Sequence, residues 1–195
     1  LSITWAASNF GHTPDTIRQF IPYLNDHCFW GGHTRNPAYQ ALAKEIRELG
    51  HHYSFYACST SMRENLYRYF RLHAWKGFEF GAETIGLYIF IDAPQGTAGT
   101  TNWKMTPQGG IAYRSDDECI SSIRMENFRR GLTDIAYLNV LKKMTAGRNT
   151  KAAEKANSFL QQAAKKAVVE LIHEPKTADR LRDEAIEHIL LLQKE

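Results

Sequence analysis

The stretch TIGLYIFID, residues 84–92, is apolar at almost every position and is bounded by polar or turn-forming residues. A short, continuous apolar run of this kind predicts a strand that is covered on both faces, which is typical of parallel sheets. Its apolar part, 85–91, is far too short to cross a bilayer, so we expect no membrane span.

Three similar units precede it. Strands are predicted in ITWAAS (3–8), LNDHCFW (24–30) and HYSFYACS (52–59), each followed by a helical pattern. Thr13-Pro14 and Asn36-Pro37 are typical helix starts. Strands that alternate with helices predict an α/β fold with a parallel sheet and right-handed crossovers.

Four such units make up half of a barrel of eight. The sheet of such a half has two unpaired edge strands and an inner face that nothing covers. The chain is then the C-terminal half of a longer (β/α)8 TIM-like barrel, or it pairs with a second copy, or it forms a small open α/β sheet. The last alternative is weakened because no GxGxxG or P-loop follows a strand.

A loop rich in Gly, Thr and Pro (93–110) leads to a long predicted helix over 121–145. Glu126, Arg130 and Asp134 lie one turn apart on it and are expected to form an alternating charge ladder. The acidic string 116–118 is interpreted as the start of this helix, where carboxylates suit the helix dipole.

Helical spacing continues over 151–172 and 177–193, with Pro175 between the two segments. These segments predict an antiparallel helical pair that serves packing. We therefore expect two parts, a barrel half over residues 1–145 and a C-terminal helical extension over 146–195.

The bulk composition excludes several classes of protein. Hydrophobic residues make up 43%, charged residues 23%, and the net charge is +3 without a basic stripe, so no nucleic-acid partner is expected. Three widely spaced cysteines form neither a disulfide framework nor a CxxC site. No HxH or HExxH spacing occurs, and His27 and Cys28 alternate along a strand, so neither a metal nor another cofactor is expected.

The chain opens on LSITWAAS without Met, and we expect an N-terminal portion before it.

The helix sequence SIRMENFRRGLTDIAYL (122–138) resembles the closing motif of the catalytic barrel of glycoside hydrolase family 123. The matching positions are Ser122, Ile123, Arg124, Glu126, Arg129, Gly131, Asp134, Tyr137 and Leu138. FYAC (55–58), the Arg71 and Trp75 pair, and GLYIF (86–90) match upstream features in the same order.

The resemblance implies a β-N-acetylhexosaminidase, of the N-acetylgalactosaminidase kind, in which the 2-acetamido group of the substrate attacks the anomeric carbon. In the family, an adjacent Asp-Glu pair orients this group and protonates the leaving oxygen. No such pair follows a strand here, so the resemblance places it upstream of residue 1. It also implies an exported, periplasmic or extracellular bacterial protein with a carbohydrate substrate.

Side chains at the carboxyl ends of the strands are the candidates for contact with a sugar. Those expected to bind substrate are Tyr56, Trp30, Asp92, Trp103, Asn9 and His33. Arg124, Glu126, Arg129 and Asp134 are expected to be structural, holding the closing helix in place. Trp75 is expected to pack its helix against the barrel.

Two other functions stay open. A non-catalytic carbohydrate-binding remnant of the same fold would explain the missing Asp-Glu pair. An open α/β enzyme of another class would have the same strand and helix pattern without a saccharide site.

Overall fold

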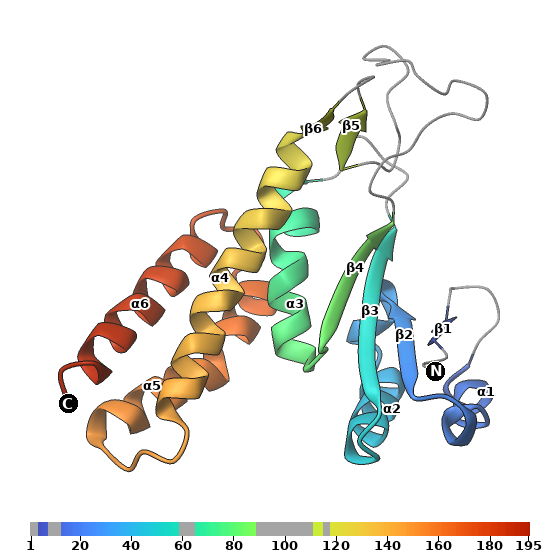
Figure 1. Ribbon diagram of the computed structural model, residues 1–195, viewed down its shortest axis with the longest axis horizontal. Helices are drawn as coiled ribbons and strands as arrows, with labels where there is room; N and C mark the ends of the chain where they lie inside the picture. Colours follow the sequence, from blue (N-terminus) through green and yellow to red (C-terminus); the bar gives the residue numbers. More distant parts are fainter. Residues whose placement is uncertain (1–3, 8–12, 59–64, 89–110, 115–117) are drawn as a thin grey trace. The chain divides into compact units, whose positions relative to one another are not determined.

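The computed structural model describes residues 4–7, 13–58, 65–88, 111–114 and 118–195. The chain forms two compact units (Figure 1). The first comprises Leu1–Glu64 and Phe80–Ser121, and the second comprises Asn65–Glu79 and Ser122–Glu195. Each unit is therefore built from two separate parts of the chain, and the boundary expected at residue 145 lies inside the second unit.

In the described part of the first unit, the main sheet has four strands in chain order, and all of them are parallel. The strands are β1 (Thr4–Ala7), β2 (Asp26–Trp30), β3 (His52–Cys58) and β4 (Thr84–Tyr88). An α/β fold is thus confirmed. Each strand lies close to its predicted range, because short apolar runs between turn signals mark strands well.

Two helices cover one face of this sheet. Helix α1 (Pro14–Arg18) is capped by the side chain of Thr13, and α2 (Pro37–Glu48) by that of Asn36. Proline occupies the first turn of both helices, where its missing N–H costs nothing. The core between helices and sheet consists of Ile17, Ile21, Phe29, Tyr39, Leu42, Ala43, Ile46, Tyr53 and Phe55.

The opposite face of the sheet is more open. Along β2, His27 and Phe29 are buried on the helix side, whereas Asp26, Cys28 and Trp30 are partly exposed. Strand β4 is partly exposed too, beginning with an exposed Thr84. In its described part, this strand is therefore not fully buried on both faces as predicted, because Ile85, Gly86 and Leu87 keep part of their surface.

A small antiparallel hairpin was missed from the sequence. Strand β5 (Ala112–Arg114) pairs with β6 (Cys119–Ser121), and Tyr113 lies opposite Ile120. The acidic string therefore does not begin the long helix: Glu118 precedes β6, and residues 115–117 lie outside the described residues. Strands of three residues carry too little periodicity to be recognised.

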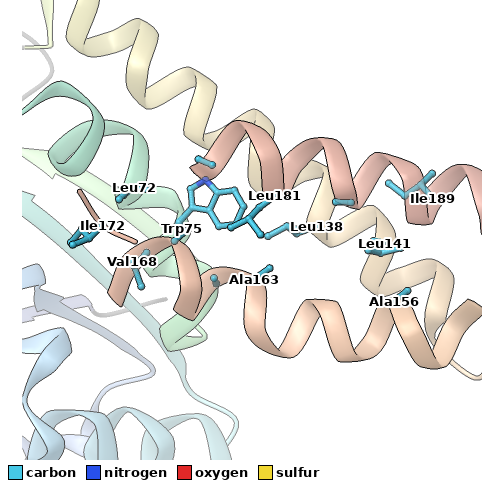
Figure 2. Close-up of a cluster of buried hydrophobic side chains, with 14 of the residues drawn as sticks. Leu72, Trp75, Leu138, Leu141, Ala156, Ala163, Val168, Ile172, Leu181 and Ile189 are labelled. Atoms are coloured by element: carbon cyan, nitrogen blue, oxygen red, sulfur yellow. The ribbon is translucent and has the colours of Figure 1, made fainter. Parts of the chain in front are cut away.

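The second unit is helical. A π-helical stretch (Leu66–Arg71) runs into α3 (Leu72–Phe80), and α4 (Ile123–Thr145), α5 (Lys151–Lys165) and α6 (Thr177–Leu192) follow the hairpin. A second π-helical stretch, Lys166–Glu170, extends α5. These helices share one apolar core, part of which Figure 2 shows around Trp75, Leu138 and Leu181.

Helices α5 and α6 therefore do not form a separate extension. Short connections make α5 antiparallel to α4 and to α6 (Figure 1). At the far end of the unit, Arg148 Nη1 donates a hydrogen bond to the Leu192 carbonyl. No helix in the described ranges is long and apolar enough to cross a membrane.

The polar residues of α4 do not form the predicted ladder. Glu126 pairs with Arg129 at 2.7 Å on the surface, Arg130 pairs with Asp179 at 3.2 Å, and Asp134 is fully buried. The Arg124 guanidinium lies over the Phe70 ring, 5.8 Å from its centroid. The ladder prediction was wrong because Glu126 pairs with Arg129, whereas Arg130 and Asp134 pair with residues of other helical segments.

Asp134 is the centre of a buried polar network. Arg71 Nε and Nη2 donate to its two oxygens at 2.8 and 3.1 Å, and Trp75 Nε1 donates at 3.0 Å. Arg71 Nη2 also donates to Asp179 at 2.7 Å, which lowers the pKa of that carboxyl group. Trp75, expected to pack against the barrel, lies instead in the core of the helical unit.

Candidate functional site

The candidate site lies where β2 and β3 end. Trp30 and Tyr56 are register partners on these neighbouring strands, and Tyr56 is in turn opposite Gly86 on β4. All three belong to the sheet face opposite the one that α1 and α2 cover. Adjacent strands lie about 4.8 Å apart, so the two aromatic residues start from neighbouring backbone positions. Gly86 has no side chain, so only Trp30 and Tyr56 contribute side chains at this level of the sheet. We call these two residues the aromatic row.

The turn after β2 fixes the Trp30 ring. The residues Gly31–Arg35 form a 3-10 helix, and a Cβ on Gly32 would lie only 1.7 Å from the Trp30 indole. The Trp30 indole therefore lies directly against Gly32, because the side chain of any other residue at position 32 would overlap the ring. A Cβ on Gly31 would approach the Tyr56 carbonyl oxygen at 3.0 Å, so this turn also passes close to β3.

His33 joins the aromatic residues to α2. Its ring meets the Trp30 ring edge-on at 5.5 Å and stacks on Tyr39 at 3.9 Å between ring centroids. Thr34 Oγ1 donates to the Gly31 carbonyl at 2.7 Å, and Gln40 Nε2 donates to the Thr34 carbonyl at 2.8 Å. These contacts support the orientation of Trp30 and give His33 a packing role.

Below the aromatic row the wall of the site is neutral. Cys28 and Ser54 are register partners on the same face. Burial raises the pKa of the Cys28 thiol, so it stays protonated near neutral pH. An aromatic platform above a neutral wall can bind the apolar face of a ligand, and neither Cys28 nor Ser54 supplies a charged group.

The structure brings together only part of the predicted set. Trp30 and Tyr56 are adjacent, and His33 contacts Trp30. The other predicted contacts, Asn9, Asp92 and Trp103, lie outside the described residues. Gly32 and Gly86 were missed as site residues, although the pair Gly31-Gly32 directly after a strand is a recognisable sign of close backbone approach.

Within the described part of the chain, His27 and Cys28 are not brought together as metal ligands. His27 is buried on the helix side of β2, and Cys28 faces the other side. Among the residues that the structure describes, no three His, Cys, Asp or Glu side chains lie close enough to share a metal ion.

The sequence matches no protein-family model and no curated protein. The structure is similar to that of a family 123 glycoside hydrolase from Clostridium perfringens, which was solved in a study of glycolipid glycan hydrolysis. The TM-score is 0.65 at 14% sequence identity, and the similarity covers 100% of this chain and 37% of the other. The chain thus spans little more than a third of that enzyme and shares with it a glycosidase-like fold.

Proposed function

We propose that this chain is part of a glycoside hydrolase that cleaves β-linked N-acetylhexosaminides, with its parallel sheet belonging to the C-terminal half of a (β/α)8-like barrel. The aromatic row of Trp30 and Tyr56 carries the proposal, because it lies toward the carboxyl ends of parallel strands, on the sheet face opposite α1 and α2. This edge is where barrel enzymes bind their substrates. The fold similarity to a family 123 enzyme supports the same assignment.

In this proposal, Trp30 and Tyr56 stack on the apolar C–H face of the sugar. The substrate-binding set is completed by Asn9, His33, Asp92 and Trp103, which can bond to hydroxyl groups or extend the platform. The acetamido group of the substrate acts as the nucleophile, so these residues need only bind and orient the sugar.

The catalytic Asp-Glu pair is proposed to come from outside this chain. Asp183-Glu184 lies within α6, where Asp183 pairs with Arg182 at 2.8 Å, and Glu118 precedes β6 in the hairpin. Neither position follows a strand of the parallel sheet. A segment before residue 1 that completes the barrel would supply the acid, and a second copy of the chain is the alternative way to cover the open face.

Sugar binding by the chain itself tests the aromatic row. The dissociation constants of N-acetylgalactosamine and N-acetylglucosamine are measured by ligand-observed NMR titration for the parent chain, Trp30→Ala and Tyr56→Ala. Loss of one stacking partner is expected to weaken binding about tenfold, which corresponds to about 1.4 kcal/mol. Tyr23→Ala is the matched control, because Tyr23 is an aromatic residue of the same unit with 76% of its surface exposed.

If binding is unchanged in both variants, or equally weakened in the control, the proposed saccharide site is wrong.

Turnover separates the enzyme from a non-catalytic carbohydrate-binding protein. A chain extended by its preceding segment should release nitrophenol from a nitrophenyl N-acetylhexosaminide. If it binds the sugar but gives no turnover, the carbohydrate-binding alternative is correct.

A further inference from the structure

A second group of polar side chains lies at the other end of the same sheet face. His52 Nδ1 is 2.5 Å from Asp26 Oδ1, and His52 Nε2 is 3.0 Å from Thr84 Oγ1. The three residues are the first residues of β2, β3 and β4, whose starting ends lie together (Figure 1). They are therefore distant along the strands from the aromatic row of Trp30 and Tyr56.

The hydrogen bonds fix the direction of proton donation. An ionised Asp26 carboxylate can only accept, so His52 Nδ1 must carry a proton and donate it. In the neutral imidazole, Nε2 is then an acceptor, and the Thr84 hydroxyl must donate to it. The order of groups is carboxylate, imidazole and hydroxyl, which is the arrangement that activates a hydroxyl nucleophile in hydrolases.

The group can also be reached from solvent. Thr84 is exposed, and the side chains of His52 and Asp26 keep 32% and 22% of their surface. The Glu83 carboxylate lies 3.8 Å from His52 Nε2, where it would stabilise the positive charge that the ring gains on accepting a proton.

We propose that Thr84, His52 and Asp26 form a hydrolytic site for small carboxylic esters. Thr84 Oγ1 forms a bond to the acyl carbon while its proton passes to His52 Nε2. The ester bond then breaks, and the alcohol leaves with the proton from His52. Water cleaves the acyl-threonine in the same way, which returns the proton to Thr84. Asp26 is a positioning residue that holds the imidazole in the required tautomer.

Labelling with a fluorophosphonate ester tests the nucleophile directly. Thr84 Oγ1 displaces fluoride from phosphorus, and the product is read by intact mass and peptide mapping of the full chain. We expect one adduct on Thr84, which is lost in Thr84→Val and kept in Thr84→Ser. His52→Gln should slow labelling by about 100-fold or more, the usual contribution of a general base.

Two further measurements complete the test. Thr133→Val is the control, because Thr133 is an exposed threonine on α4 that belongs to neither site. This variant should label like the parent chain. Asp26→Asn should lower the labelling rate and change its pH profile, because an amide permits the wrong tautomer of His52. Each variant is checked for parent-like circular dichroism.

Several results would overturn the proposal. These are the absence of an adduct on Thr84, labelling that does not depend on His52, or a Thr84→Ser variant that is folded but unreactive. The three residues would then only tie the starts of three strands together. The experiment uses no sugar and tests residues at the opposite end of the sheet from Trp30 and Tyr56. Its failure therefore leaves the glycosidase proposal unaffected.

Discussion

Asp134 is a carboxylate with no exposed surface in the core of the helical unit, where Arg71 and Trp75 supply its hydrogen bonds. Replacing it with Asn removes the charge that balances the Arg71 guanidinium and points an amide donor at other donors. Breaking a buried pair in this way costs about 3–5 kcal/mol of unfolding free energy. Urea denaturation followed by circular dichroism measures the loss.

The matched control is Asp183→Asn, a charge removal on α6 where the carboxylate keeps 61% of its surface and pairs with Arg182. Exposed pairs contribute about 0–1 kcal/mol. If the two variants are equally stable, the buried network does not hold the unit together.

Gly131 of α4 lies directly against the backbone of the π-helical stretch Leu66–Arg71. A Cβ at this position would be 2.2 Å from the Arg71 carbonyl oxygen, and backbone atoms cannot move aside easily. We expect Gly131→Ala to lower the melting temperature, although alanine favours helices by about 1 kcal/mol. Asn139→Ala, at an exposed position of the same helix, should leave the melting temperature unchanged or raise it. A stable Gly131→Ala chain would contradict the close contact.

His27 makes the first unit sensitive to acid. Burial is the main cause that lowers its pKa below the ordinary value of 6.5, and the nearby His51, stacked at 5.8 Å between ring centroids, adds to the effect. Below pH about 6.5 the unfolded chain then binds a proton that the folded chain resists, so the free energy of unfolding falls as the pH falls.

Urea denaturation at pH 7.5 and pH 5.5 measures this effect. We expect His27→Gln to reduce the difference in unfolding free energy between the two pH values. His173→Gln, which removes an exposed histidine, should leave the difference unchanged. An identical pH dependence of the parent chain and His27→Gln would exclude His27 as the cause.

At the scale of elements, α4 depends on the residue that caps its N-terminus. Ser122 accepts hydrogen bonds from the N–H groups of Arg124 and Met125 at 3.1 and 3.2 Å. Ser122→Ala leaves these donors without the cap and should cost about 1 kcal/mol of unfolding free energy, whereas Ser122→Asp should keep most of the stability. Chemical denaturation measures the unfolding free energy of the two variants. If both lose the same amount, the cap does not stabilise the helix.

The elements were also the part of the structure that the sequence predicted best. Thr13-Pro14 and Asn36-Pro37 gave the starts of α1 and α2, because capping and proline placement are local effects. The hairpin of β5 and β6 and the π-helical stretches were not predicted. Three-residue strands and irregular helical turns leave no periodic signal in a sequence.

At the scale of the molecule, residues 65–79 complete the core of the C-terminal helices. They contribute Arg71, the partner of Asp134, and Trp75, the largest buried side chain of this core. A fragment of residues 122–195 should therefore lack cooperative urea unfolding, because it leaves Asp134 unpaired and a cavity in place of the indole. Addition of a peptide of residues 65–79 should restore some cooperativity. A fragment that unfolds cooperatively alone would contradict this division of the chain.

The sequence by itself determined the alternation of strands and helices, the parallel sheet, the helix caps and the position of Trp30 and Tyr56 at strand ends. Periodicity, capping and strand direction act over a few residues, so a linear chain displays them. Only the tertiary structure decided that Asp134 pairs with Arg71, that Trp75 belongs to the helical core, and that Asp26, His52 and Thr84 meet. These partners are 26 to 63 residues apart, and packing alone brings them together.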